Sequence, residues 1–294
     1  MELTLLYRGP LSGCNYDCPY CPFAKRRESR TDRERDERAL ERFLAWVEDQ
    51  RHRRLSVFFT PWGEALVRAC YRRALVRLTG LSHVRRAVIQ TNLSCGLDWV
   101  HRCDRSRLAL WCSFHPGQVD RKRFLSRCLE LHAEGVSFSV GVVGLREHLE
   151  PASLLRAELP PEVYLWVNAF KRLPGYYSRD EAAAWTALDP LFPLNHARHP
   201  SLGRPCHTGE RVVSVDGDGV MRRCHFVPEP IGNLYAPDWE SALRPRTCPN
   251  ETCGCHIGYV HMPELRLEEV FGDGLLERIP VPQESASVSP KFVE

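Results

Sequence analysis

The sequence predicts an α/β fold: a partial (β/α)6, TIM-like barrel followed by a small cysteine-rich C-terminal domain. Three observations predict it. Short apolar runs alternate with amphipathic stretches, the alternation occurs six times, and prolines, Asp-Gly turns and cysteines become dense after Pro190. Alternating strands and helices imply a parallel sheet with right-handed crossovers. Six units are too few for a closed eight-stranded barrel and suit an open, three-quarter barrel.

Each predicted strand is short and rich in Val, Leu, Phe or Tyr, as expected for strands buried on both faces. The six strands are Leu3–Arg8, Leu55–Thr60, Arg86–Thr91, Leu108–Phe114, Ser137–Val143 and Tyr164–Ala169. In a parallel α/β fold the loops that follow the strands meet at one edge of the sheet and carry the functional site. The site is therefore expected in these loops.

Apolar residues at helical spacing predict the helices between the strands. One stripe consists of Leu40, Phe43, Leu44 and Val47, and a second consists of Phe124, Cys128, Leu131 and His132. Asp120 is the predicted N-cap of the second helix, and Gly135 is its predicted C-terminal stop.

The C-terminal third is expected to form a separate small domain. Val212–Val215 and Val220–Cys224 flank an Asp-Gly-Asp-Gly turn, which predicts a β-hairpin. The predicted division is a barrel at 1–194, a cysteine-rich domain at 195–262 and an extension at 263–294. The Pro/Ser-rich end of that extension, from Pro280, is predicted to be poorly ordered.

Charge and hydropathy limit the possible partners and compartment. The net charge is only +3, and the densest basic run, Lys25–Arg38, alternates with acids as a solvated helix face does. Both features argue against a nucleic-acid partner. No apolar run is long enough to span a membrane, and the N-terminus lacks the pattern of a signal peptide. A cytoplasmic protein is therefore expected, in which thirteen cysteines predict metal binding rather than disulfides.

Three cysteines directly follow the first predicted strand. Cys14, Cys18 and Cys21 are spaced four and three residues apart on one loop. Three thiolates in this arrangement can bind three irons of a [4Fe–4S] cluster and leave the fourth iron open for a ligand. The alternative is a structural zinc loop, but zinc normally takes a fourth protein ligand, and no candidate lies close in sequence.

The C-x3-C-x2-C pattern, with the aromatic Tyr20 before its last cysteine, resembles the radical SAM superfamily. The resemblance implies that the open iron binds the amino and carboxylate groups of S-adenosylmethionine (SAM). It also implies reductive cleavage of SAM to a 5′-deoxyadenosyl radical, which takes hydrogen from a substrate. An electron donor such as ferredoxin or flavodoxin would reduce the cluster.

Further landmarks follow the later strands in the order of that superfamily. Residues 60–64, Thr-Pro-Trp-Gly-Glu, resemble the GGE motif with Trp62 in place of the first glycine, while Gly63 and Glu64 are kept. As an alternative, Gly-Glu could simply open a helix. The resemblance implies further SAM contacts at Thr91, Asn92, Ser113 and Val142. The first glycine of the adenine-binding segment is replaced by Val140.

Five more cysteines lie close together in the C-terminal third: Cys206, Cys224, Cys248, Cys253 and Cys255. The first two fit C-x12-G-x4-C through Gly219, which resembles the opening of the SPASM and twitch auxiliary-cluster domains. This implies a second [4Fe–4S] cluster on Cys206, Cys224 and two of the remaining three, with Cys253 and Cys255 favoured over Cys248. His207 and His256 keep a mixed zinc site open as an alternative.

The remaining cysteines occur singly in strand or helix patterns and are predicted to be buried apolar residues. They are Cys70, Cys95, Cys103, Cys112 and Cys128.

The substrate implied by the resemblance is a peptide or a small metabolite. The first strand begins at residue 3, so no leader-peptide-binding module is expected ahead of it. Two alternatives stay open, an RNA-modifying radical SAM enzyme and a zinc-stabilised binding protein without catalytic activity. Candidate substrate contacts near the strand ends and the last cysteine are His115, Asn168, Lys171, Tyr176, Tyr177, Tyr259 and His261.

Overall fold

The structure, a computed structural model, describes residues 2–23 and 26–281. Its centre is a nine-stranded sheet in the order β11-β10-β9-β1-β2-β3-β4-β5-β6. Strands β1 to β6 lie side by side in chain order and are parallel. Their bounds are β1 Glu2–Arg8, β2 Arg54–Phe59, β3 Val84–Thr91, β4 Leu108–Phe114, β5 Ser137–Gly144 and β6 Leu165–Ala169. The predicted α/β class and all six predicted strands are confirmed.

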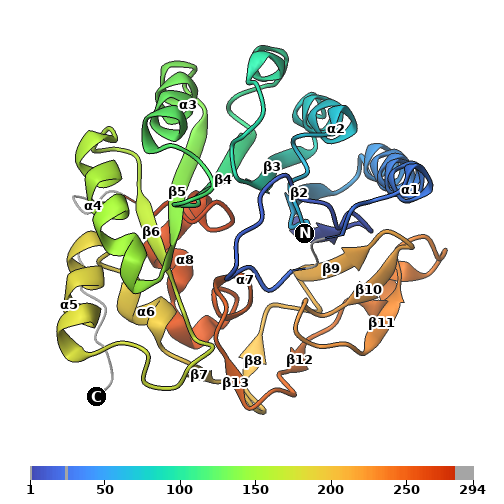
Figure 1. Cartoon of the computed structure of the whole chain (residues 1–294). Coiled ribbons are helices and arrows are strands. Elements are labelled where there is room, and N and C mark those ends of the chain that lie inside the picture. The colour runs from blue at the N-terminus through green and yellow to red at the C-terminus, as the bar shows by residue number, and fades with distance from the viewer. Residues whose placement is uncertain (1, 24–25, 282–294) are drawn as a thin grey trace.

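Helices lie outside the arc of strands, as Figure 1 shows for α1 to α4. The helices of this part of the chain are α1 Arg30–Asp49, α2 Ala69–Thr79, α3 Arg121–Ala133, α4 Leu149–Glu158, α5 Arg179–Leu188 and α6 Phe192–His196. The apolar stripe of α1 is buried, and Asp120 caps α3 as predicted. Two expectations were wrong: His132 of α3 is exposed, and only a 3-10 helix, Asp98–Arg102, connects β3 to β4. The segment between β3 and β4 forms no α-helix because its apolar residues do not repeat at a sustained helical spacing.

Helix α1 also departs from the expected solvated face. Asp36 is fully buried, although it lies in the charged run that was predicted to face water. Its Oδ1 accepts hydrogen bonds from the Leu11 amide at 3.1 Å and the Tyr71 hydroxyl at 3.0 Å, and its Oδ2 lies 3.4 Å from Arg68. A buried carboxylate needs such partners. Asp36 thereby holds the chain that leads from β1 to Cys14.

The predicted hairpin is confirmed as β9, Val212–Asp216, paired antiparallel with β10, Val220–Arg222. It does not stand apart from strands β1 to β6, because β9 pairs in parallel with β1 and thus continues the same sheet. Strand β11, Pro230–Asn233, forms the outer edge. Two small antiparallel pairs follow, formed by β7 His199–Pro200 with β13 Thr252–Cys253 and by β8 Pro205–Cys206 with β12 Arg246–Thr247.

Residues 256–281 pack inside the arc of strands (Figure 1). Helices α7, His256–Tyr259, and α8, Leu267–Phe271, lie inside the arc of strands (Figure 1). Leu276 then joins an interior cluster with Phe58 and Trp111, and the Ser139 hydroxyl donates to the carbonyl of Glu277. The tail predicted from Pro280 falls mainly on residues 282–294, which lie outside the described residues.

The buried pair between Arg86 and Glu277 fastens this C-terminal segment to β3. Glu277 is fully buried and accepts from Arg86 Nε at 2.8 Å. Removing one partner of a buried ion pair costs about 3 kcal/mol because the other charge stays buried. We expect Arg86→Met to lower the melting temperature by about 5–10 °C, measured by circular dichroism.

Arg85 provides the matched control, because it pairs with the more exposed carboxylates of Glu2 and Asp273. Exposed ion pairs contribute about 1 kcal/mol or less, so Arg85→Met should shift the melting temperature by about 2 °C at most. Equal shifts for the two variants would contradict the assignment of Glu277 as a buried anchor.

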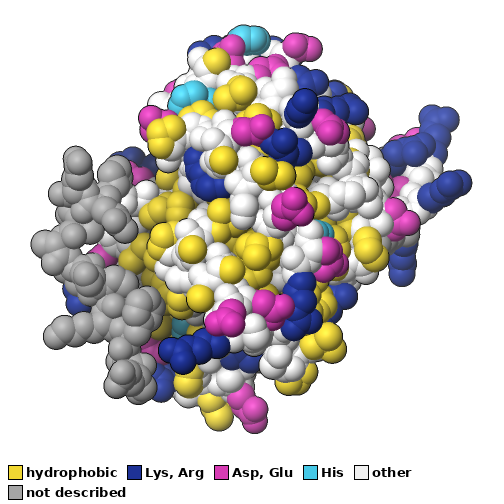
Figure 2. Space-filling model, turned by 60° about the vertical axis from the view of Figure 1, so that its left-hand side comes forward, with side chains coloured by type: hydrophobic (Ala, Val, Ile, Leu, Met, Phe, Trp, Pro, Cys, Tyr) yellow, Lys and Arg dark blue, Asp and Glu magenta, His cyan; other side chains and the backbone are white. Residues whose placement is uncertain are grey.

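The surface carries charges of both signs. Lys and Arg side chains are interspersed with Asp and Glu on the face shown in Figure 2. Within the described residues, no helix is both long enough and apolar enough to cross a membrane.

Candidate active site

A cavity of about 770 Å³ opens at the carboxyl ends of β1 to β6. Its volume lies in the range of small-molecule sites. The residues expected to bind a cofactor or iron all line it, although they come from both ends of the chain. These are Cys14, Cys18, Tyr20, Cys21, Gly63, Glu64, Thr91, Asn92, Ser113, Val142, Cys206, Cys224, Cys248, Cys253 and Cys255.

The first cysteine loop is held by bonds to distant parts of the chain. The Ser12 amide donates to Glu28 Oε1 at 2.8 Å, and the Asp17 amide donates to Gln118 Oε1 at 2.8 Å. Within the loop, the Cys21 amide donates to the Cys18 carbonyl at 3.1 Å. None of the three cysteines of this loop takes part in a disulfide. These hydrogen bonds fix the conformation of the loop, and its three cysteines line the cavity.

Gly63 lets the loop after β2 approach the cysteine loop. A Cβ at this position would lie 1.9 Å from the Gly13 carbonyl oxygen and 3.2 Å from the Cys14 nitrogen. The amide of Glu64 donates to the same Gly13 carbonyl at 3.1 Å. The glycine is therefore required by backbone contact with the segment that carries Cys14.

Glu64 joins the loops after β2 and β3. Its carboxylate is 2 % exposed and accepts from the Thr91 hydroxyl at 2.8 Å, the Leu66 amide at 3.0 Å and the Asn92 amide. The side chain of Asn92 then donates to Asn15 Oδ1 at 3.0 Å, on the cysteine loop. Three successive strand ends are therefore connected through one buried carboxylate.

Burial raises the pKa of Glu64 from its ordinary 4.5 to about 7, although its hydrogen bonds oppose the shift. A raised carboxyl pKa means that the folded state keeps a proton which the unfolded state has lost. This contribution to stability is therefore lost as the pH rises from 4.5 to 7. Between pH 5.5 and 8 we expect the titration of Glu64 to lower the free energy of unfolding by about 2 kcal/mol.

The variant Glu64→Gln cannot titrate at this position and tests the prediction. The amide nitrogen of glutamine also replaces an oxygen that accepts a hydrogen bond, and a buried donor then lacks its partner. Glu64→Gln should therefore be less stable than the wild type at pH 5.5. The deficit should shrink by about 2 kcal/mol at pH 8, measured by urea unfolding of both proteins. A deficit that is independent of pH would contradict the raised pKa.

His115, which follows the end of β4, lies against the cysteine loop. Its Nδ1 is 3.0 Å from the Tyr20 hydroxyl and 3.5 Å from Cys18 Sγ. Burial, with a smaller contribution from His148, lowers the pKa of His115 to about 4. The imidazole is thus neutral at pH 7 and fixes the ring of Tyr20 beside the cysteines.

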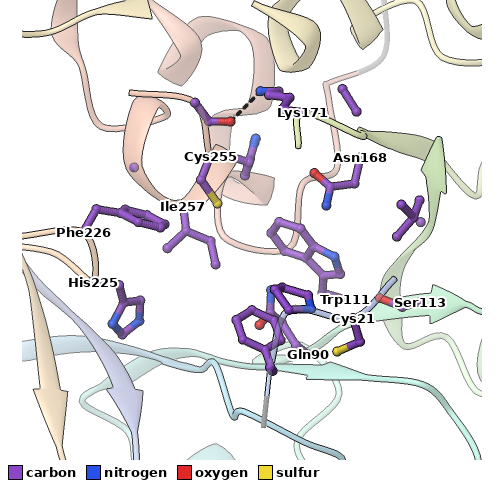
Figure 3. A pocket seen from close by; sticks show the side chains of 18 of the residues that line it. Cys21, Gln90, Trp111, Ser113, Asn168, Lys171, His225, Phe226, Cys255 and Ile257 are labelled. Carbon is purple, nitrogen blue, oxygen red and sulfur yellow. Dashed lines mark hydrogen bonds between the residues drawn. The ribbon is translucent and has the colours of Figure 1, made fainter. Parts of the chain in front are cut away.

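Aromatic and aliphatic side chains form the inner wall of the cavity. Trp111, Phe226 and Ile257 lie around it in Figure 3 and come from three separate segments. Trp166 of β6 adds a second indole, 4.7 Å from Trp111 between ring centroids. Gly141 makes room for it, since a Cβ there would lie 1.9 Å from the Trp166 ring. The sequence analysis missed these residues because they belong to ordinary apolar strand and loop patterns.

Cations outnumber acids on the cavity wall. Arg8, Lys171, Arg172 and Arg198 line it, whereas Glu64 is the only carboxylate among its described lining residues. Arg8 donates from Nε to the Thr60 carbonyl at 2.8 Å and lies over the Trp62 ring. The cavity is therefore suited to negatively charged groups.

The candidate substrate contacts divide into two sets. His115, Asn168 and Lys171 line the cavity, whereas Tyr176, Tyr177, Tyr259 and His261 do not. Tyr177 instead joins β5 to the loop after β6, because its hydroxyl donates to the Gly144 carbonyl at 2.6 Å and accepts from the Phe170 amide at 2.7 Å. The expectation that it borders the cavity was wrong.

The solitary cysteines follow the prediction. Cys70, Cys95, Cys103, Cys112 and Cys128 are all buried and belong to the main apolar core. Within the described part of the chain, no three His, Cys, Asp or Glu side chains stand close enough to hold a single metal ion. A [4Fe–4S] cluster differs from such a site because each thiolate binds a different iron.

Comparison with solved structures places this arrangement in a known fold. Native anSMEcpe with bound AdoMet superposes with a TM-score of 0.56 at 13% identity, covering 82% of this chain and 80% of that chain. The complex of native anSMEcpe with AdoMet and Cp18Cys peptide gives 0.53 at 13% identity, covering 80% and 78%. The chain has the radical SAM fold. No family model matches the sequence, and no curated protein does so either.

The radical SAM fold of this chain puts its motifs in one place. A third structure, polyhistidine-tagged anSMEcpe with bound AdoMet, gives a TM-score of 0.54 at 15% identity over 80% of this chain and 75% of that chain. The shared sheet brings the loops after β1 to β6 to a common edge. Function depends on the side chains placed there rather than on the fold itself.

Proposed function

We propose that this protein is a radical SAM enzyme that cleaves SAM reductively and directs the resulting radical at a peptide or small-metabolite substrate. The observation that carries the proposal is one cavity lined by every predicted iron ligand and SAM contact. Residues as far apart in the chain as Cys14 and Cys255 converge there. The shared fold supports the proposal independently of the motif.

The donor set fits a [4Fe–4S] cluster at the loop after β1. Cys14, Cys18 and Cys21 lie beside the cavity and form no disulfide, and Gly63 lacks the Cβ that would displace their loop. Such a cluster, when bound, supplies the electron for SAM cleavage, and its single open iron accepts the cofactor. Arg8 and Lys171 provide positive charge on the same wall, which favours anionic groups.

The chain's own residues would position SAM. Polar groups of Thr91, Asn92 and Ser113 stand at neighbouring strand ends, where they can bind ribose and carboxylate oxygens. Val142 offers an apolar surface for adenine beside them. Trp111 and Trp166 would give a carbon radical an apolar wall, which limits its side reactions.

The substrate would bind in the part of the cavity that is bordered by the aromatic wall and the C-terminal cysteines. A cavity of about 770 Å³ suits SAM together with a small molecule or a single peptide side chain. The structural neighbour anSMEcpe has been seen with a Cp18Cys peptide and AdoMet together. An electron donor of the ferredoxin or flavodoxin type completes the proposal, because reductive cleavage consumes an electron.

The experiment is an anaerobic assay. The protein is reconstituted with iron and sulfide, reduced with dithionite and mixed with SAM, and 5′-deoxyadenosine is measured by mass spectrometry. Cys14→Ala is the control. Deoxyadenosine from the wild type alone supports the proposal. Zinc in place of iron and sulfide, or iron-loaded protein that forms no deoxyadenosine with any candidate substrate, would contradict it.

A further inference from the structure

We propose that Cys206, Cys224, Cys248 and Cys253 hold the auxiliary cluster, and that Cys255 stays free and faces the substrate cavity. The inference rests on the proposed function, because it assumes that a second cluster is present. It differs from the sequence-based preference, which favoured Cys255 over Cys248. The five cysteines line the same cavity, but Cys255 packs against a different apolar cluster from Cys206 and Cys253.

Backbone pairing brings three of the four ligands together. Cys206 lies in β8, which follows the loop after β7, and the Gly203 amide in this loop donates to the Cys248 carbonyl at 2.8 Å. The Cys248 amide in turn donates to the Arg204 carbonyl at 2.9 Å. Cys253 in β13 pairs with His199 in β7, at the start of the same loop. One short loop therefore contacts the backbone of both later cysteines.

Cys224 joins this group from the end of the β9–β10 hairpin. Arg223, the residue before it, donates to the Thr208 hydroxyl at 3.2 Å and to the carbonyl of Thr247, which precedes Cys248. The Thr208 hydroxyl in turn donates to Cys206 Sγ at 3.2 Å. The segment that carries Cys224 is therefore held beside both Cys206 and Cys248, and all four proposed ligands line the same cavity.

Cys255 lies on a different side of its segment. It packs against the interior apolar cluster that contains Trp111, Trp166 and Ile257. Cys206 and Cys253 pack instead against a separate cluster of Tyr259, Val260, Met262, Leu267 and Phe271. Figure 3 shows the sulfur of Cys255 directed into the cavity. Two cysteines only two residues apart therefore point to different environments.

Lys171 holds the segment in this orientation. Its ammonium group donates to the Ala197 carbonyl at 3.2 Å and to the Gly254 carbonyl, between the two cysteines. Figure 3 shows the second of these bonds as a dashed line beside Cys255. Two cations border the residue before Cys255, since a Cβ at Gly254 would lie 3.6 Å from Arg198 Nη1 and 3.7 Å from Lys171 Nζ. A ligand role would require the segment to rotate and break the bond from Lys171.

The division has a functional consequence. A cluster with four protein thiolates has no open iron, so the auxiliary cluster would transfer electrons and would not coordinate the substrate. Cys255 would then be a substrate-contacting thiol on the wall of the same cavity that the first cysteine loop borders. Its packing against the apolar cluster that contains Trp111 and Trp166 places it near a molecule bound on that wall.

The first test compares iron content in two variants of the same segment. Two clusters hold about eight irons. After anaerobic reconstitution, we expect about eight irons per chain in the wild type and in Cys255→Ala, but about four in Cys253→Ala. Loss of half the iron from Cys255→Ala would overturn the inference. A wild type without iron would contradict the proposed function instead, so the two failures are distinguishable.

The second test measures thiol reactivity in the iron-loaded protein and does not depend on catalysis. Iron-bound thiolates are shielded from alkylation, whereas a free thiol in an open cavity is accessible. We expect iodoacetamide to modify Cys255 at least about tenfold faster than Cys253, with both sites read by peptide mass spectrometry. Removal of iron by a chelator should make the two rates comparable. Equal protection of both cysteines in the loaded protein would overturn the inference.

Discussion

Gly63→Ala is expected to lower the rate of 5′-deoxyadenosine formation by at least about 100-fold when the reduced enzyme is mixed with SAM. The added Cβ would lie 1.9 Å from the Gly13 carbonyl oxygen and 2.5 Å from its carbon. Both are backbone atoms, so no side-chain rotation relieves the clash. Either the loop after β2 or the loop that carries Cys14 must move.

That displacement has a direct effect on the proposed cluster site. The hydrogen bond from the Glu64 amide to the Gly13 carbonyl, at 3.1 Å, would be lost. A shift of about 1 Å in positioning groups is enough to reduce a rate by two orders of magnitude. Iron analysis and the electron paramagnetic resonance signal of the first cluster should fall together with activity.

Gly96 offers the matched control, because it lies in the loop after the neighbouring strand β3. A Cβ there would meet nothing closer than an Asp98 oxygen at 3.9 Å, and its backbone does not require glycine. Gly96→Ala should keep wild-type iron content and activity. Comparable activity losses in both variants would contradict the specific role assigned to Gly63.

Cys18→Ala is expected to abolish SAM cleavage and to leave about four irons per chain, those of the auxiliary cluster. Cys18 is the buried member of the first cysteine loop and lies 3.5 Å from His115 Nδ1. Without its thiolate, two ligands remain for a cluster that needs three. The C-terminal cysteines come from other segments, so their iron should be unaffected.

Cys95→Ala is the control for this variant. Cys95 is also buried, but it belongs to the apolar core and does not line the cavity. The substitution should cost stability through the lost thiol volume while both clusters and SAM cleavage persist. If Cys18→Ala removed both clusters at once, the division into two iron sites would be wrong.

Local sequence patterns were sufficient to predict the strands and the candidate site. Each parallel strand is an apolar run whose burial on both faces is visible in its composition. Because the loops that follow parallel strands share one edge, the landmarks at Gly63, Thr91 and Ser113 could be placed together from the order of the strands alone. The hairpin after residue 211 followed from its Asp-Gly turn in the same way.

Other features depend on partners far away in the chain, and no local pattern contains them. Asp36 looked like one acid among many in a solvated helix, but it is buried by the contacts of Leu11, Tyr71 and Arg68. Glu277 is similar, since its burial depends on Arg86 of β3, 191 positions away. A buried charge is determined by its surroundings rather than by its neighbours in sequence.

The sequence by itself determined the α/β class, the order of the strands along the chain and the cysteines that we propose as iron ligands. Spacing and residue chemistry carry that information. Only the tertiary structure decided that the C-terminal hairpin continues the sheet beside β1, that Trp111 and Trp166 line the cavity, and that Cys253 and Cys255 pack against different apolar clusters. These outcomes depend on packing between distant segments, where burial and excluded volume select one arrangement among many with the same local pattern.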